Sequence, residues 1–202
     1  MRLLVAVLLL VTLLIVIGIH WYLLRRLVLD TTRRGASARK WATAAIAYFV
    51  TGNHEYHSGF EDWIAEVRSL GLRPLRNERV ELDGLDLAGV NDATAGSAGD
   101  PPDYDRALAG RDTSRPVVLL AHQPIQAHEA ARRGADLQIS GPTHGGQMWP
   151  FSLVIAAQQP VVAGLGRVDG MPVYVSRGAG FWGPPVRVCA PPDITLIELR
   201  TR

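Results

Sequence analysis

Cysteine and charge are both scarce in this sequence, and each scarcity excludes a class of protein. The 202 residues include one cysteine, Cys189, which excludes an internal disulfide framework and any metal site built from several cysteines. Charged residues make up 20% and hydrophobic residues 48%, a balance that excludes a disordered chain. The length is sufficient for one domain, or for one small domain with an attached segment.

Acidic residues are nearly absent from the first 40 positions, where seven basic residues accompany only Asp30. The rest of the chain therefore holds 14 of the 21 basic residues and 18 of the 19 acidic residues. The isoelectric point near 9.0 comes from the amino-terminal segment. It gives no support to nucleic-acid binding by the rest of the chain, and we expect no nucleic-acid partner.

The segment Leu3–Leu24 is apolar and contains no Asp, Glu, Lys or Arg. As a helix it would be roughly 33 Å long, which matches the hydrocarbon thickness of a bilayer. We predict a transmembrane anchor over residues 1–26 and a basic connector over residues 27–43. Because the basic residues follow the span, residues 25–40 are expected on the cytoplasmic side of a bacterial inner or plasma membrane, in a single-pass protein. The alternative is a signal peptide, whose apolar region is usually only about 7–15 residues long and ends in small residues.

The remaining residues, 44–202, are predicted to form one α/β domain with a layered, mixed β-sheet. Apolar runs alternate with helical patterns in the first half of this region and with hairpins and loops in the second half, which is typical of layered α/β domains. The expected helices cover residues 60–70, with Gly71 as the cap, and Ile125–Arg133. The expected strands are Ala44–Val50, Val80–Leu82, Leu85–Val90, Pro116–Ala121, Leu137–Ser140, Val173–Ser176 and Ile194–Leu199.

Three short segments place a histidine on a tight loop directly after an apolar strand. They are Thr51–Glu55 (TGNHE), Leu120–Pro124 (LAHQP) and Gly141–Gln147 (GPTHGGQ). Ligands of open α/β sheets bind at the carboxyl ends of the strands. Imidazole nitrogens and amide oxygens are good ligands for first-row transition metals. The three loops therefore predict a polar, metal-binding cleft at one edge of the sheet.

The same three segments, GNHE, the strand-ending His122 and THGGQ, resemble the last three sequence blocks of the calcineurin-like metallophosphoesterases. The subgroup with the strongest resemblance is bacterial, membrane-attached and carries a GHTHGGQ block. The resemblance covers roughly residues 47–199. It implies a metallophosphoesterase-like β-sandwich flanked by helices, and hydrolysis of a phosphoester that is either a small molecule or linked to a lipid.

The resemblance also implies a role for each residue in the blocks. Two divalent transition-metal ions, of Mn, Fe, Zn or Ni, would lie side by side. Asn53 and His122 would bind one metal and His144 the other, while His54 would protonate the leaving group or stabilise the transition state. In two-metal hydrolysis, a metal-bound hydroxide attacks the phosphorus and the cations offset the developing charge.

The chain departs from the family in its ligand count. No Asp-x-His block and no Gly-Asp-x-x-Asp block precedes residue 44, and Pro142 stands where another ligand histidine is expected. Three ligands remain of about seven, and no carboxylate is among them, so we expect at most one weakly bound metal. The sequence thus predicts a partial, truncated domain with weak or no activity. The alternatives are a non-catalytic, membrane-tethered metal-binding or interaction remnant, and an enzyme completed by ligands from a second chain.

The other polar and aromatic residues near these blocks receive structural interpretations. Glu55 and Asp92 are the available substitute carboxylates, but nothing in their spacing requires that role. Trp149 and Trp182 are expected to be packing residues rather than substrate platforms. The other two histidines of this region, His57 and His128, are expected at the surface.

Overall fold

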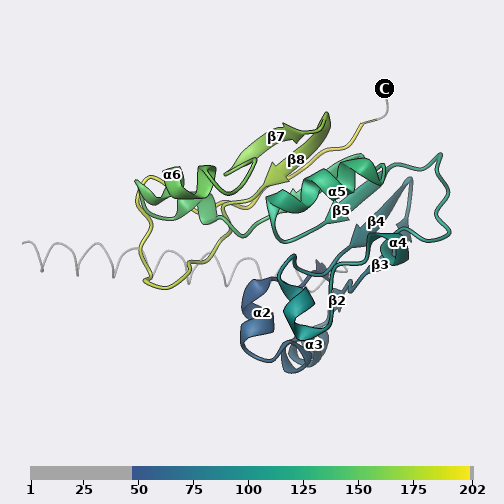
Figure 1. The fold of residues 1–202 in the computed structure, drawn as a ribbon, viewed down its shortest axis with the longest axis horizontal. Coiled ribbons are helices and arrows are strands. Elements are labelled where there is room, and N and C mark those ends of the chain that lie inside the picture. Colours follow the sequence, from purple (N-terminus) through teal and green to yellow (C-terminus); the bar gives the residue numbers. More distant parts are fainter. Residues whose placement is uncertain (1–46, 201–202) are drawn as a thin grey trace, which may run out of the picture.

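The computed structural model describes residues 47–200, and its centre is a six-stranded mixed β-sheet (Figure 1). The four central strands, β4, β5, β6 and β8, run parallel to one another, and β3 and β7 pair antiparallel at the two edges. In spatial order the strands are β3 (Glu78–Leu82), β4 (Leu85–Gly89), β5 (Val117–Leu120), β6 (Leu137–Ser140), β8 (Met171–Val175) and β7 (Gly164–Val168).

Short helices and a second, two-stranded sheet surround this central sheet. The small sheet pairs β1 (Ala47–Phe49) in parallel with β2 (Leu72–Pro74). This arrangement confirms the predicted mixed α/β fold with helices beside a multi-stranded sheet. The helices are α2 (Asn53–His57), α3 (Phe60–Ser69), α4 (Tyr104–Ala107), α5 (Ala127–Arg132) and α6 (Phe151–Ala156), with 3₁₀ turns η1 (Ala95–Ala98), η2 (Pro124–Gln126) and η3 (His144–Gly146).

The central sheet packs an apolar core on each face, and its strand β5 carries an aliphatic residue at every position. Along β5, Val117 and Leu119 belong to the core that includes residues of α4 and α5, whereas Val118 belongs to the core that includes Leu75 of the β2–β3 connection. Alternate side chains of a strand point to opposite faces, so one short segment contributes to both cores. The strands are therefore held from two sides, which fixes the direction in which their carboxyl ends point.

Two local predictions are confirmed. The strands on either side of Asp83–Gly84 form the expected hairpin, in which Leu82 pairs with Leu85 and Gly84 adopts a φ of 78°, the left-handed conformation that such two-residue turns need. The expected helix at residues 60–70 is α3, and Gly71, with a φ of 81°, follows its last turn. The hydrophobic spacing and the turn chemistry were sufficient for both elements.

Other local predictions are wrong. The described residues 194–199 form no strand, and Leu196 is 94% exposed. A β-strand requires a hydrogen-bonded neighbour, and this apolar tail lies outside both sheets. The sequence interpretation also missed β2, β7, α2 and α6, which are all too short for their hydrophobic pattern to have a clear period.

The amino-terminal predictions fall largely outside the described residues. Of the predicted strand Ala44–Val50, residues Ala47–Phe49 form β1. The predicted anchor at residues 1–26 and the connector at residues 27–43 lie outside residues 47–200, so these boundaries stay predictions. Within residues 47–200, no helix is long and apolar enough to cross a bilayer.

Candidate metal-binding site

The three histidine loops follow β1, β5 and β6, and the last two of these strands are parallel neighbours. Their carboxyl ends therefore meet at one edge of the sheet. The histidine side chains of the three loops interact electrostatically. Burial lowers the pKa of His144, and the positive charges of Arg187, His122 and His54 lower it further. The structure thus brings the predicted residues to a common region.

Two of the candidate metal ligands, Asn53 and His122, are in direct contact. The His122 Nε2 atom lies 3.1 Å from the Asn53 Oδ1 atom, although the residues are 69 positions apart. The backbone of Gly52 packs directly on the imidazole, since a Cβ atom at this position would lie 2.7 Å from His122 Cε1. A glycine before the helix therefore allows Asn53 to reach the histidine.

Glu55 caps the helix that carries Asn53. The Gly52 amide donates a hydrogen bond of 2.6 Å to the Glu55 carboxylate, which is the return arm of a capping box. This interaction satisfies a free amide at the start of α2. It occupies Glu55 Oε2, which supports the interpretation of Glu55 as a structural residue rather than a substitute metal ligand.

Asp92 is the second carboxylate near His122. It is fully buried, accepts hydrogen bonds from the amide and hydroxyl of Thr94, and accepts two more from the Gln123 side chain at 2.9 and 3.1 Å. Because Gln123 follows His122 in the chain, these bonds fix the loop that carries the histidine. Gln123 lies within the LAHQP segment, but its residue type alone does not predict this role.

Burial lowers the pKa of His122, while the negative charges of Asp92 and Glu55 act in the opposite direction and the His54 charge lowers it further. The net effect is a lowered pKa, so the imidazole stays neutral at pH 7. A neutral imidazole has one nitrogen lone pair, which is the form that binds metals.

His144 is held by an arginine that the sequence analysis did not consider. Arg187 donates from Nη2 to His144 Nδ1 at 3.0 Å and from Nη1 to the His144 carbonyl at 3.2 Å. The same guanidinium donates to the carbonyls of Arg177 at 2.7 Å and Ala190 at 3.1 Å. Arg187 therefore ties the loop after β8 to the loop that carries His144.

The Arg187 contact determines which nitrogen of the His144 imidazole carries the proton. When Nδ1 accepts a hydrogen bond, the neutral ring carries its proton on Nε2. His144 then presents an N–H donor at Nε2 rather than a lone pair. The backbone is fixed as well, because a Cβ atom at Gly146 would collide with the Ser152 backbone at the start of α6.

The chain is similar to several curated proteins over three quarters of its length. It is 43% identical over 155 residues to an uncharacterized metallophosphoesterase from Helicobacter pylori, a match that covers 75% of this chain and 42% of that protein. It is 34% identical over 161 residues to an uncharacterized metallophosphoesterase from Aquifex aeolicus, covering 76% of this chain and 60% of the relative. This chain belongs to the calcineurin-like metallophosphoesterase family.

A further relative of this metallophosphoesterase is named a transmembrane protein with metallophosphoesterase domain, from Bos taurus. It is 39% identical over 170 residues, which cover 76% of this chain and 38% of the relative. The chain thus spans about two fifths of the length of the first curated relatives it matches. No family model and no solved structure matches it.

Membership of the metallophosphoesterase family implies dependence on a divalent metal, and the donor pair Asn53–His122 fits one edge of a metal site. Two ligands that are each about 2.1 Å from one cation, at a right angle, lie about 3.0 Å apart. The observed separation is 3.1 Å. However, within residues 47–200 no group of three His, Cys, Asp or Glu residues is placed to hold a metal ion. The described residues thus fit part of a coordination shell, not a whole one.

The remaining candidate residues occupy different environments. His54 is exposed on the first turn of α2, with its ring centroid 6.5 Å from that of Trp182. His57 is exposed, as predicted, and His128 is paired with Asp169 at 2.8 Å. Trp149 and Trp182, which were expected to be packing residues, are 64% and 49% exposed, respectively.

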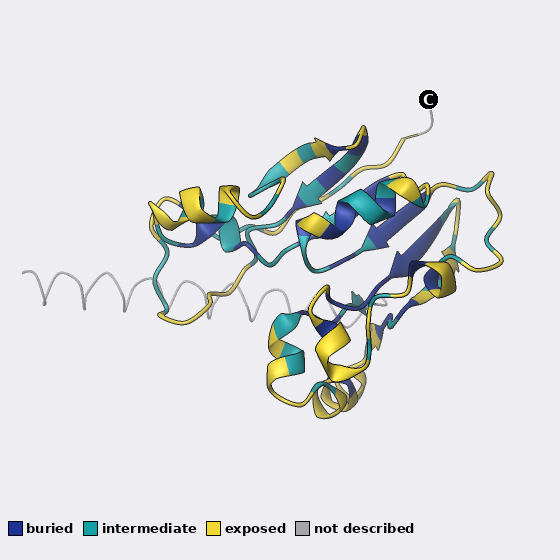
Figure 2. Cartoon of the chain, in the orientation of Figure 1, coloured by how far each residue is buried: buried dark blue, intermediate teal, exposed yellow. Residues whose placement is uncertain are grey.

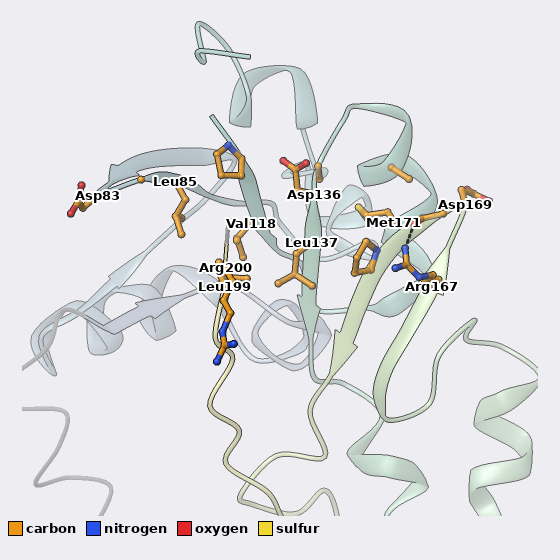
Figure 3. Close-up of a pocket in the computed structure, with 16 residues that line it drawn as sticks. Asp83, Leu85, Val118, Asp136, Leu137, Arg167, Asp169, Met171, Leu199 and Arg200 are labelled. Atoms are coloured by element: carbon orange, nitrogen blue, oxygen red, sulfur yellow. Dashed lines mark hydrogen bonds between the residues drawn. The ribbon is translucent and has the colours of Figure 1, made fainter. Parts of the chain in front are cut away.

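A separate cavity of about 920 Å³ lies at the opposite edge of the sheet (Figure 3). Its lining includes Pro116, Asp136 and Met171, which precede or begin the parallel strands β5, β6 and β8. The histidine loops follow the other ends of the strands. The cavity is therefore distinct from the candidate metal-binding site.

Proposed function

We propose that this chain carries the amide and imidazole side of a membrane-attached, metal-dependent phosphoester hydrolase. Asn53 and His122 would hold one divalent cation, His144 would bind the other, and His54 would protonate the leaving group or stabilise the transition state. The observation that carries the proposal is the 3.1 Å contact between Asn53 Oδ1 and a neutral His122. Metallophosphoesterase relatives support the phosphoester substrate class.

Each residue contributes a separate part of this function. Divalent cations, when bound, stabilise charge on phosphoryl oxygens and supply hydroxide near neutral pH. His54 is exposed and can move to meet a substrate, so it is suited to donate a proton to the leaving oxygen. Asp92 and Gln123 hold the His122 loop rigidly, as the groups behind a metal ligand commonly do.

The contact with Arg187 suggests a second role for His144. With Nδ1 accepting from Arg187, Nε2–H can donate to a phosphoryl oxygen. Binding a cation through Nε2 requires His144 to lose that proton or Arg187 to release Nδ1. The metal content of an Arg187→Ala variant distinguishes the two roles: release of Nδ1 should raise metal binding only if His144 is a ligand.

The activity of this chain is proposed to be weak or absent. The side chain of Pro142 has no metal-binding atom, and the nearby carboxylates Glu55 and Asp92 already accept hydrogen bonds. Little negative charge is left to balance two dications. This scarcity favours, as the second candidate function, a non-catalytic metal-binding or interaction module. Completion of the site by a second polypeptide is the third candidate.

Membrane attachment through residues 1–26 is part of the proposal. The apolar run in the sequence supports it, as do the names of the relatives from Bos taurus and Danio rerio, which are transmembrane proteins with a metallophosphoesterase domain.

The test measures bound metal and hydrolysis in the full-length chain. Protein purified in detergent would be dialysed against Mn²⁺ or Zn²⁺ and analysed by mass spectrometry for metal per chain. Hydrolysis of p-nitrophenyl phosphate and its bis ester would be measured in parallel. Asn53→Ala and His122→Ala should each lower bound metal. His54→Ala should preserve bound metal and remove any hydrolysis.

His57→Ala is the matched control, since His57 is an exposed histidine on the same short helix and should change neither quantity. Two metals per wild-type chain would contradict the ligand count. Metal binding that survives both Asn53→Ala and His122→Ala would contradict the site itself.

A further inference from the structure

An exposed apolar surface lies beside the candidate site. It is formed by six side chains, each between 43% and 66% exposed, and we call it the apolar rim. Figure 2 shows most of α6 exposed, and no residue of α6 is buried. The members of the apolar rim are Trp149, Phe151, Leu153, Val154, Phe181 and Trp182.

The apolar rim is one surface although it comes from two distant segments. Gln147 accepts a hydrogen bond from the Trp182 amide and donates one to the Trp182 carbonyl, each 2.5 Å long. The Trp149 amide donates to the Val188 carbonyl at 3.1 Å. Figure 1 places α6 and the loop after β8 together at one end of the molecule. The backbone thus fixes the two segments against each other.

The segments that build the apolar rim carry almost no charge. Residues 137–166 are thirty consecutive positions without Asp, Glu, Lys or Arg, and residues 178–186 are nine more. Charged side chains normally cover an exposed helix, and monomeric soluble proteins rarely expose a large contiguous apolar patch. Tryptophan combines an apolar ring with one N–H donor, which suits the boundary between lipid and water.

We propose that the apolar rim lies in the lipid–water interface of the membrane, and that the site beside it acts on phosphoesters whose apolar part stays in the bilayer. The inference rests on the proposed function for the position of the site. The His54 and Trp182 rings, 6.5 Å apart between centroids, connect the site to the rim. A headgroup at the interface would thus come within reach of His54.

The length of chain before β1 supports a lipid occupant. The predicted span ends at Arg26 and β1 begins at Ala47, which leaves twenty residues between them. Even fully extended, these residues reach only about 70 Å. The domain is then held at a high effective concentration next to the bilayer, so a weakly binding apolar surface is sufficient.

The charge of the apolar rim also fits a lipid surface. The two uncharged segments contain no carboxylate that would repel anionic headgroups. The partly exposed Arg177, which also pairs with Asp193 at 3.7 Å, lies directly before the second segment. A cation at the edge of an apolar surface favours anionic lipid.

The test uses the full-length chain reconstituted into vesicles of phosphatidylcholine with phosphatidylglycerol. Cys189, the only cysteine, is replaced by serine. Single cysteines are then introduced as Leu153→Cys or Trp182→Cys in the apolar rim, and as Ser69→Cys for the control. Ser69 is exposed at the end of α3, away from the rim. Each is labelled with a polarity-sensitive fluorophore and exposed to lipids that carry a doxyl quencher.

Labels at positions 153 and 182 should emit at shorter wavelength than the label at position 69 and be quenched at least about twofold more by doxyl lipid. Equal quenching at all three positions would overturn the proposal. A shift to shorter wavelength without lipid quenching would also overturn it, since protein, such as a second copy of the chain, would then cover the rim. The fluorescence readout does not depend on hydrolysis. Lipid contact without p-nitrophenyl phosphate cleavage would support membrane contact by the apolar rim and reject the proposed activity.

Discussion

Replacing Gly52 by alanine should disrupt the Asn53–His122 pair through steric contact alone. The backbone of Gly52 has a φ of −109°, which any residue can adopt. A Cβ atom would, however, lie 2.7, 2.8 and 2.9 Å from three atoms of the His122 ring. To restore an ordinary van der Waals contact of 3.4 Å, the ring or the start of α2 must move by about 0.7 Å.

This displacement sets the size of the effect. Metal–ligand distances tolerate a change of about 0.2 Å, so a shift of about 0.7 Å removes one ligand from its position. Disturbing the groups that orient a ligand typically lowers metal affinity about 10- to 100-fold. Overpacking costs roughly 1–3 kcal/mol of stability, and the loss of a glycine cap adds about 0.5–1 kcal/mol.

Two further variants separate these causes. Gly52→Ser restores a good helix cap but keeps the added Cβ, so it should lose metal affinity as Gly52→Ala does. Gly141→Ala is the control, because Gly141 also follows a strand at this edge and a Cβ atom there meets nothing within 4 Å. Mn²⁺ affinity by calorimetry and the urea midpoint would be measured for all three. If Gly52→Ala binds and unfolds like Gly141→Ala, the reasoning about this contact is refuted.

Three other outcomes can be measured on the same chain. Asp86→Asn should lower the free energy of unfolding by about 3–5 kcal/mol, because Asp86 is fully buried between two arginines. Asp105→Asn, at an exposed ion pair, should lower it by only about 0–1 kcal/mol. Urea titrations of both variants measure the difference. Arg187→Ala should cost about 2 kcal/mol and lower the melting temperature, because several carbonyls lose a charged donor; an unchanged melting temperature would show that the two loops hold together without it. The free energy of unfolding should fall as the pH drops below 6.5, because burial lowers the pKa of His122 in the folded chain and the unfolded chain therefore takes up the proton at a higher pH. His122→Gln should flatten this pH dependence. An unchanged slope in the variant would contradict the role of His122.

The parts of the fold that the sequence predicted are those with a local physical cause. The β3–β4 hairpin follows from Asp83–Gly84, and β6 coincides with the predicted strand Leu137–Ser140. The approach of the histidine loops at one edge also followed from the sequence, since parallel strands place their carboxyl ends together. A local pattern was sufficient for the hairpin and for β6, whereas the approach of the loops, which joins residues 69 positions apart, followed from the general geometry of α/β sheets.

The parts that could not be predicted depend on contacts between distant segments. Arg187 is an ordinary basic residue in a Gly- and Pro-rich stretch, and its role arises only because the chain returns to His144, 43 positions earlier. The tail at residues 194–199 has the composition of a strand but finds no strand to pair with in the described part of the chain. The exposure of Trp149 and Trp182 likewise depends on the tertiary packing of their segments, which composition does not determine.

The charge around the candidate site connects its structure to its expected chemistry. His122 and His144 both have a lowered pKa, and burial is the first cause in each. The nearest carboxylates, Glu55 and Asp92, accept hydrogen bonds from the Gly52 amide and the Gln123 side chain. A divalent cation bound by neutral ligands keeps its full charge, so it attracts a phosphoryl group strongly but is itself held weakly. An anionic phosphoester would supply the negative charge that the described residues lack, and by linkage each of the two would then increase the affinity for the other.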